Sequence, residues 1–240
     1  MLDIKEFENR IICGDCLEIM GDLPDKSIDL CLTDPPYGIG KEGVVNDENL
    51  EQFNKVLPEI YRVMKDNTWF VTFFSSELLP QAFINNPFKY VWLGFIYYSN
   101  AQRIMHCRCG KSKQSTYLVF EKGHAKRCDF IFDVQHYVYG GDNKMIKHTA
   151  LKPLESIEIL VRGYSKKDAI VLDPFVGSGT TALACKRLNR RYIGIEINPD
   201  YYELSRQRLM NIPNHLDSYA SDAPRGEPLR PAGGASDGGR

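Results

Sequence analysis

The residues best suited to chemistry are Asp34-Pro35-Pro36-Tyr37, which follow Thr33 at the end of a largely apolar run, Ile28–Leu32. Such a run predicts a buried strand, and two successive prolines end it because they lack the N–H that a ladder needs. In an open α/β sheet, ligands bind at the carboxyl ends of the strands. Asp34 and the Pro35 carbonyl could accept hydrogen bonds from an exocyclic amino group, while Tyr37 stacks on the base that carries it. A rigid turn with Tyr37 covering the core is the simpler alternative.

A second stretch, Val171–Thr181, reads as a strand, a glycine turn and the start of a helix. Gly177 and Gly179 let the backbone turn tightly and approach a ligand, and a helix N-terminus favours a negative group. The stretch lacks both Gly-x-Gly-x-x-Gly and the Lys-Ser/Thr of a phosphate loop, so the nucleotide-phosphate motifs do not fit. Glu196 follows Gly177 by nineteen residues at the end of the next predicted strand, where an acid binds ribose hydroxyls.

Hydrophobic periodicity predicts alternating strands and helices around these residues. The predicted strands are Arg10–Asp15, Ile28–Leu32, Thr68–Phe74, Tyr90–Tyr98, Gln114–Phe120, Ile170–Leu172 and Tyr192–Ile197, with a turn at Glu121–Gly123. The predicted helices are Cys16–Leu23, Asn49–Met64, Glu77–Ile84, Leu151–Val161, Gly179–Leu188 and Tyr201–Met210. Pro58 either kinks the second helix or begins a new one. No periodicity is clear over Cys128–Met145.

Acids follow four of the predicted strands, and their order suggests a permuted sheet. The strands that end at Asp173 and Glu196 come last in the chain, whereas those that end near Asp15 and Asp34 come first. If these strands lie side by side in one parallel sheet, all four carboxylates line a single cleft at the carboxyl ends.

Together, the Asp34 and Gly177 stretches resemble the DNA amino-methyltransferases, which methylate N6 of adenine or N4 of cytosine, in the motif order of the β group. The resemblance implies an α/β fold: a Rossmann-like class I methyltransferase fold, circularly permuted. Its sheet would be mostly parallel, with an antiparallel edge and a small basic insertion. The implied cofactor is S-adenosyl-L-methionine, and the implied partner is double-stranded DNA.

The resemblance also assigns residues. It implies that the glycine turn and Phe175 hold the methionine part of the cofactor, Glu196 the ribose and Asp15 the adenine. The family's His-Pro-Thr-Gln-Lys-Pro segment corresponds to His148–Pro153, of which Lys152 and Pro153 match in its second half. The predicted catalytic residues are Asp34, Pro35, Pro36 and Tyr37. The predicted cofactor-binding residues are Asp15, Lys152, Asp173, Phe175, Gly177, Gly179, Thr180 and Glu196.

The expected reaction is a direct displacement on a base flipped out of the duplex, helped by orientation and electrostatics. Asp before Pro-Pro-Tyr leans toward adenine by family habit, with N4 of cytosine as the alternative. A cytosine-C5 enzyme would need a cysteine nucleophile, usually after a proline, and no cysteine here follows one. Methylation of RNA or of a protein amide is a further alternative for the reaction. A cofactor-binding or DNA-binding subunit without activity is an alternative to an enzyme.

Composition is that of a globular protein, with 43% hydrophobic and 25% charged residues. The formal net charge is −1, yet residues 101–152 carry ten Lys/Arg against four Asp/Glu. This segment is either a phosphate-binding surface or an ordinary solvated one. We predict a catalytic domain over 1–212, a target-recognition insertion over 100–147 and a disordered tail over 213–240. The insertion is short for recognising a DNA sequence by itself, so a homodimer or another partner is a further alternative.

The seven cysteines form no framework of disulfides, which favours free thiols in a reducing cytoplasm. No apolar run is long enough for a membrane span, and the first ten residues lack a signal-peptide core. His106, Cys107, Cys109, His124 and Cys128 could offer zinc ligands, but their spacing fits no standard finger. We therefore predict no metal site and a basic loop with free cysteines.

Overall fold

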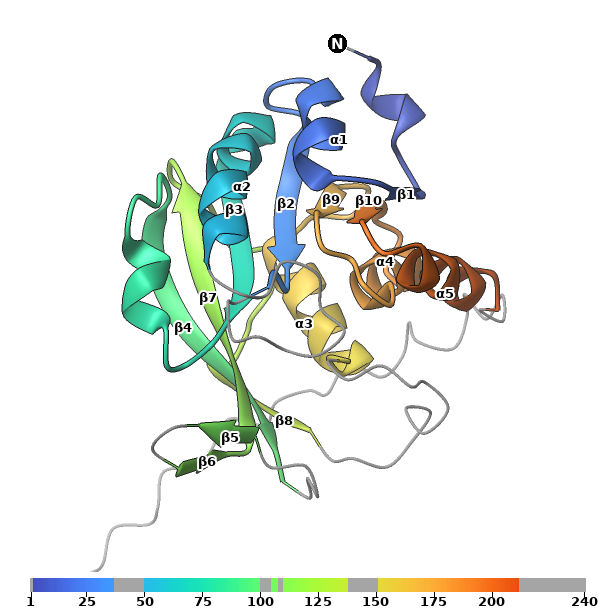
Figure 1. Cartoon of the computed structure of the whole chain (residues 1–240). Helices are drawn as coiled ribbons and strands as arrows, with labels where there is room; N and C mark the ends of the chain where they lie inside the picture. Colours follow the sequence, from blue (N-terminus) through green and yellow to red (C-terminus); the bar gives the residue numbers. More distant parts are fainter. Residues whose placement is uncertain (1, 37–49, 100–104, 108–109, 138–150, 212–240) are drawn as a thin grey trace, which may run out of the picture.

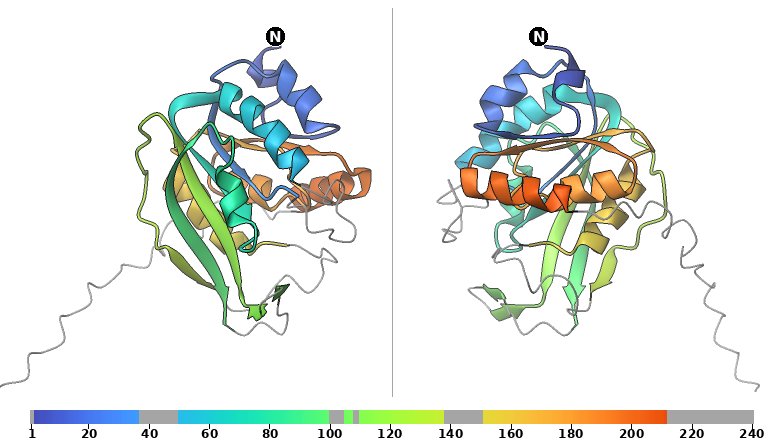
Figure 2. Two further views of the ribbon diagram at one scale, coloured as in Figure 1. Left: turned by 60° about the vertical axis from the view of Figure 1, so that its left-hand side comes forward. Right: turned by 90° about the vertical axis from the view of Figure 1, so that its right-hand side faces the viewer.

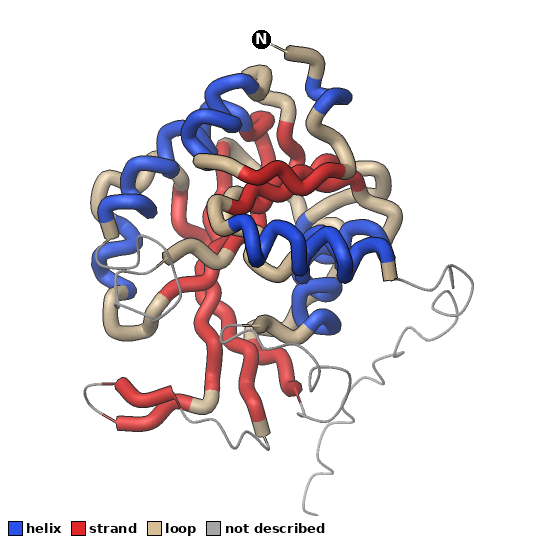
Figure 3. The backbone as a smooth tube through the Cα atoms, turned by 45° about the vertical axis from the view of Figure 1, so that its right-hand side comes forward, coloured by secondary structure: helices blue, strands red, loops and turns tan. Residues whose placement is uncertain are grey.

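The computed structural model describes residues 2–36, 50–99, 105–107, 110–137 and 151–211. A single large β-sheet lies between two layers of helices (Figures 1 and 3). Its strands are β1 (Arg10–Cys13), β2 (Ile28–Thr33), β3 (Met64–Phe74), β4 (Lys89–Tyr98), β7 (Gln114–Lys122), β8 (Val134–Tyr137), β9 (Ile170–Asp173) and β10 (Arg191–Glu196). Strands β5 (Met105–Cys107) and β6 (Gly110–Ser112) form a separate hairpin. The helices are α1 (Cys16–Asp22), α2 (Glu51–Val63), α3 (Leu154–Tyr164), α4 (Thr180–Arg187) and α5 (Pro199–Met210), with 3₁₀ turns η1 (Ile4–Glu6) and η2 (Leu79–Phe83).

The strand order is β1-β10-β9-β2-β3-β7-β4-β8. The first five strands are mutually parallel, and β7 runs antiparallel to both β3 and β4. Strands β9 and β10, from late in the chain, lie between β1 and β2. This confirms that the four acid-tipped strands are neighbours and that the sheet is mostly parallel. The expected antiparallel edge is wrong, because the antiparallel strand β7 lies between β3 and β4, and the outermost strand, β8, pairs parallel with β4.

Each helical layer covers one face of the sheet with its own core. Helix α2 illustrates how the sequence encodes this arrangement, because its buried Phe53, Val56, Leu57 and Ile60 recur at helical spacing. They pack with α1, η2 and one face of the sheet. Helices α3, α4 and α5 bury Leu160, Ala184 and Leu209, among others, against the opposite face. Burial on both faces explains why the central strands are apolar without alternation.

Several elements differ from the sequence expectation. Pro58 lies inside one helix that runs from Glu51 to Val63, instead of beginning a second helix. The helix expected over Glu77–Ile84 is a short 3₁₀ turn, and β8 was not predicted at all.

The turn expected at Glu121–Gly123 is wrong for its first two residues, because Glu121 and Lys122 belong to β7 and are buried. Buried charges need partners. Glu121 accepts from Lys89 Nζ at 2.8 Å, and Lys122 Nζ donates to two backbone carbonyls.

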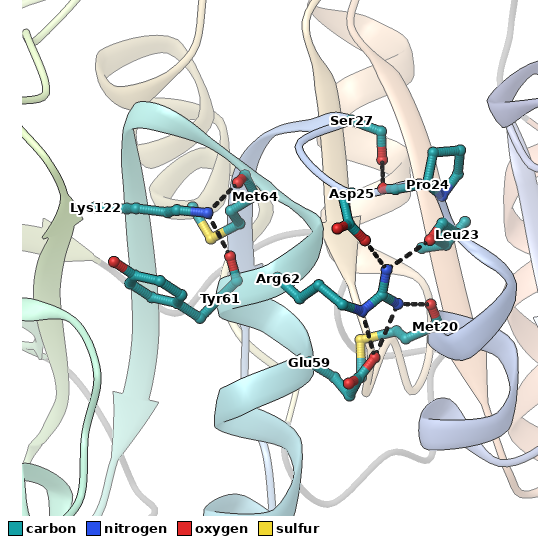
Figure 4. Close-up of polar contacts among 10 residues, drawn as sticks. All are labelled: Met20, Leu23, Pro24, Asp25, Ser27, Glu59, Tyr61, Arg62, Met64 and Lys122. Carbon is teal, nitrogen blue, oxygen red and sulfur yellow. Dashed lines mark hydrogen bonds and ion pairs between the residues drawn. The ribbon is translucent and has the colours of Figure 1, made fainter. Parts of the chain in front are cut away.

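The amino ends of the parallel strands lie together along one border of the sheet, called the amino edge below. A closed polar cluster surrounds Arg62 there (Figure 4). The guanidinium donates to the carbonyl oxygens of Met20 at 2.6 Å and Leu23 at 2.9 Å, which end α1. It also pairs with Asp25 at 2.6 Å and Glu59 at 2.8 Å. Arg62 thus ties the end of α2 to the end of α1 and to the turn that enters β2.

Lys122 lies in the neighbouring part of the same amino edge (Figure 4). Its ammonium donates to the carbonyl oxygens of Tyr61 at 2.6 Å and Met64 at 2.7 Å and lies 4.4 Å from the centroid of the Tyr61 ring. Burial lowers the pKa of this lysine. The side chain therefore joins β7 to the junction between α2 and β3.

The predicted recognition segment, 100–147, contains β7, a strand of the main sheet, together with the β5–β6 hairpin and β8. Its remaining parts, 100–104, 108–109 and 138–147, lie outside the described residues, as does the predicted tail. Of the helices in the described ranges, none has the length and apolar character to cross a bilayer.

Candidate active site

Asp34 lies where β2 ends, as the sequence predicts, and its two carboxylate oxygens have different surroundings. Oδ2 forms an ion pair with Lys152 Nζ, which also lies 4.7 Å from the centroid of the Phe73 ring. Oδ1 is buried and has no hydrogen-bond partner among the described residues. A buried acceptor without a partner is costly, so Oδ1 is suited to a donor that arrives with a ligand. Tyr37 lies outside the described residues.

Asp173 ends the neighbouring strand β9 and supports the loops around the site from beneath. It accepts from Thr33 Oγ1 at 2.7 Å and from the Phe175 backbone N–H at 3.1 Å. Burial raises the pKa of Asp173 to about 6, against the opposing effect of its hydrogen bonds with Thr181 and Thr33. The carboxylate therefore joins the end of β2 to the loop that follows β9.

The glycine turn between β9 and α4 has the backbone that the sequence predicts. Gly177 and Gly179 have φ values of 52° and 83°, in the left-handed region that favours glycine. A side chain at Gly179 would also bring its Cβ within 2.9 Å of Ser205 Cβ in α5. Thr180, the first residue of α4, is buried and accepts from Arg208 at 3.2 Å. Helix α5 therefore supports the turn from behind.

Glu196 at the end of β10 holds this turn from the ligand side. Its Oε2 accepts from the Gly177 N–H at 2.8 Å, and its Oε1 accepts from the Asn198 N–H at 2.8 Å. Burial raises the pKa of Glu196. Each carboxylate oxygen can accept more than one hydrogen bond, so capacity remains for ligand hydroxyl groups.

An open cleft lies at these strand ends. It is lined by Gly14, Asp15, Cys16, Pro36, Gln52, Pro174, Phe175, Ile195, Glu196 and Ile197. Asp15, Phe175 and Glu196 were predicted to bind the cofactor, and Pro36 belongs to the predicted catalytic motif. The cleft thus brings together residues from the two ends of the chain.

Asp15 has a local structural role at this cleft, since its Oδ1 caps α1 by accepting from the Leu17 N–H at 2.7 Å. Beside it, burial raises the pKa of Cys16 to about 12. A thiol in this state is protonated near neutral pH and is not a nucleophile.

The sequence analysis missed Gln52 and Ile197 as cleft residues. Gln52 lies on α2, and its amide donates to Cys16 Sγ at 3.6 Å. Ile197 directly follows Glu196 and is 43% exposed. The signal available in the sequence was an apolar residue directly after the acid that ends a predicted strand. Such a pair suits a ligand that has both a flat ring and hydroxyl groups.

The described residues contain no group of His, Cys, Asp and Glu side chains arranged to hold a metal ion. The side chains of His106, Cys107 and Cys109 lie outside this description, so the absence of zinc stays a prediction. The donor set of the cleft, a buried carboxylate beside aromatic and aliphatic side chains, fits a nucleoside-containing cofactor.

Comparison with known proteins supports this assignment. A family model described as "DNA methylase", of the N6/N4 type, matches residues 85–207. The putative methylase YubD of Escherichia coli K12 is 30% identical over 222 residues, which is 89% of this chain and 96% of that protein. The type II methyltransferase M.HpaI of Haemophilus parainfluenzae is also 30% identical, over 88% of this chain and 77% of its own length. The chain therefore belongs to the N6/N4 DNA methylase family.

Solved structures agree with the fold. The chain superimposes on M1.HpyAVI in complex with SAM with a TM-score of 0.63 and 26% identity, over 83% of this chain and 99% of that one. PvuII DNA methyltransferase, which is cytosine-N4-specific, gives a TM-score of 0.68 over 86% of this chain and 87% of its own length. At 18% identity, that second likeness concerns the fold alone.

Proposed function

We propose that this chain transfers a methyl group from S-adenosyl-L-methionine to the N6 amino group of adenine in double-stranded DNA. The observation that carries the proposal is the state of Asp34. One of its oxygens is paired with Lys152, and the other is buried at the end of β2 with no partner among the described residues, close to the cleft that Glu196 lines. An amino group is the donor that would satisfy this free acceptor.

The cofactor would be held by residues from both ends of the chain. Glu196 suits the ribose hydroxyls, Ile197 and Phe175 suit the adenine ring and its surroundings, and the turn at Gly177 suits the methionine part. The strand order supports a circularly permuted class I methyltransferase fold, because β9 and β10 follow the rest of the sheet in sequence but lie between β1 and β2. The bound cofactor would supply a methyl group on a sulfonium. The amino nitrogen would displace the thioether S-adenosylhomocysteine from that methyl group and would then release one proton to solvent.

The protein's own residues orient the acceptor. Hydrogen bonds from the amino group to Asp34 and to the Pro35 carbonyl would localise the nitrogen lone pair and fix its direction. The amino group is out of reach inside a duplex, so the base must flip into the site. Stacking on Tyr37 would contribute about 1–3 kcal/mol.

The DNA would bind along the carboxyl edge of the sheet. Figures 1 and 2 show the β5–β6 hairpin beyond the ends of β4 and β7, on the side toward which β2 points. A projection of this kind, in a segment rich in Lys and Arg, supports a role for residues 100–147 in contacting DNA. A homodimer would extend that contact.

The test is transfer of a tritiated methyl group from S-adenosylmethionine to unmethylated genomic DNA, followed by mass analysis of the nucleosides. The expected product is N6-methyladenine. N4-methylcytosine, the second candidate product because the family model covers both bases, would keep the site and overturn the choice of adenine. Cofactor binding without any DNA product would contradict the proposal and direct the search to RNA or a protein amide.

A further inference from the structure

Lys152 occupies a position that a cofactor-binding role does not explain. It precedes Pro153, the N-cap residue of α3, and α3 is anchored by buried Ile157 and Leu160. The Lys152 side chain is only 14% exposed. Its ammonium contacts the Asp34 carboxylate on one side and lies over the Phe73 ring on the other. The helix start and the ring therefore hold the ammonium against the predicted catalytic acid.

The charges around Asp34 are unbalanced without this lysine. Asp173, on the adjacent strand β9, is buried, and the nearby Asp34 carboxylate adds to the effect of burial in raising the pKa of Asp173. Neighbouring carboxylates favour protonation of each other. On β9, Asp173 interacts electrostatically with Asp34, and the segment before α3 brings the Lys152 ammonium to the same carboxylate. The far side of that ammonium lies over the uncharged Phe73 ring of β3. Lys152 is thus the cation that offsets this repulsion.

We propose that Lys152 is a positioning residue of the methyl-accepting site, which fixes the direction of the Asp34 carboxylate by binding Oδ2 and leaves Oδ1 to accept from the target amino group. This inference rests on the proposed function for the identity of the target. It follows from the division between the two oxygens, one paired with Lys152 and the other buried without a partner among the described residues. Without the ammonium the carboxylate would be free to rotate, and Oδ1 would no longer be directed at the amino group.

The test compares Lys152→Met, which keeps the length of the side chain without its charge, with Lys152→Arg, which keeps the charge. Lys55→Met, at an exposed ion pair on α2, is the matched control. For Lys152→Met we expect kcat to fall about 100-fold, as for other errors of alignment, with the Kd for S-adenosylmethionine unchanged. Lys152→Arg, which can still bind Oδ2, should restore most of the lost kcat.

A second measurement does not depend on activity. The carbon-13 chemical shift of the Asp34 carboxyl, measured at one pH in the wild-type chain and in Lys152→Met, should change when the ammonium is removed. An unchanged chemical shift in a folded variant would overturn the inference. A large rise in the Kd for S-adenosylmethionine with kcat retained would also overturn it, by assigning Lys152 to the cofactor. If the wild-type chain methylates no DNA, the proposed function fails, while the chemical shift still decides whether Lys152 contacts Asp34.

Discussion

The two edges of the sheet treat buried polar groups in opposite ways. At the amino edge, Arg62 and Lys122 donate to backbone carbonyls at the ends of α1 and α2 and at the start of β3. At the carboxyl edge, Asp34 has one buried oxygen without a partner among the described residues, and burial raises the pKa values of Asp173 and Glu196.

This difference separates residues that stabilise the fold from residues that are placed to bind a ligand, within one sheet. A closed polar cluster contributes to holding elements together, whereas an open acceptor or a carboxylate with a raised pKa reduces stability unless a ligand satisfies it. Such groups gather at functional sites. Substitutions at the two edges should therefore affect different measurements.

The largest effect is expected for Asp34→Asn. The amide keeps the shape of the side chain but can place a donor where the target amino group must donate. We expect methyl transfer to fall about 10²- to 10³-fold, with the Kd for S-adenosylmethionine by calorimetry and the melting temperature nearly unchanged. Loss of cofactor binding in a folded variant would contradict the assignment of Asp34 to the target amino group and not to the cofactor.

At the amino edge, Arg62→Met should act on stability alone. It removes the donor from the Met20 and Leu23 carbonyls and leaves Asp25 and Glu59 without their cation. We expect the free energy of unfolding in urea to fall by about 2–4 kcal/mol, with kcat per folded molecule unchanged. The control is Arg206→Met, at an exposed pair on α5, which should change stability by about 0.5 kcal/mol or less. A fall in kcat for Arg62→Met would show that the edges are coupled.

Asp173→Asn tests the carboxyl edge through pH. The pKa of Asp173 is raised from 3.8 to about 6, so between these values the native state holds a proton that the unfolded state has released. Stability from this group is therefore present below about pH 4 and is lost as pH rises through about 6, by roughly 3 kcal/mol in all. Asn should remove that slope from urea denaturation curves measured between pH 4 and 7.

The amino edge provides the control of opposite sign. A hydrogen bond with Lys26 lowers the pKa of exposed Asp66, so its contribution to stability is present above the ordinary pKa and is lost as pH falls through the lowered one. Asp66→Asn should leave the slope between pH 4 and 6 nearly as in the wild type. Equal slopes in wild type and Asp173→Asn would contradict the raised pKa.

The smallest effect is expected for Glu196→Gln. The amide oxygen can keep one of the two backbone hydrogen bonds to Gly177 and Asn198, and the other must be lost. We expect the Kd for S-adenosylmethionine to rise about tenfold, which corresponds to roughly 1.4 kcal/mol. Glu203→Gln, at an exposed residue of α5, is the control. An unchanged Kd for Glu196→Gln would exclude this carboxylate from the cofactor site.

The sequence predicted the arrangement of the sheet because its signals are local. An apolar run followed by an acid marks the end of each parallel strand, so the adjacency of the ends near Asp15, Glu196, Asp173 and Asp34 could be inferred. The glycine turn was equally visible, since Gly177 and Gly179 are needed for left-handed backbone.

What could not be predicted depends on distant partners. Glu121 and Lys122 have the composition of a turn. Their burial depends on partners far away in sequence, which are Lys89 for Glu121 and the carbonyls near Tyr61 for Lys122. The contact of Lys152 with Asp34 spans 118 residues and carries no local pattern. Strand β8 is four residues long at the sheet edge, too short for its periodicity to be distinguished from a loop.

The place of β9 and β10 in the sheet has a consequence for synthesis of the chain. Strand β2 pairs with β9, and Cys31 lies beside Leu172 from the last third of the chain. A chain emerging from the ribosome must therefore keep the facing edges of β1 and β2 unpaired until about residue 196 has been made. Exposed apolar strand edges invite pairing with other chains, and contacts so distant in sequence form slowly. The permuted order thus makes the growing chain depend on prompt completion or on chaperones.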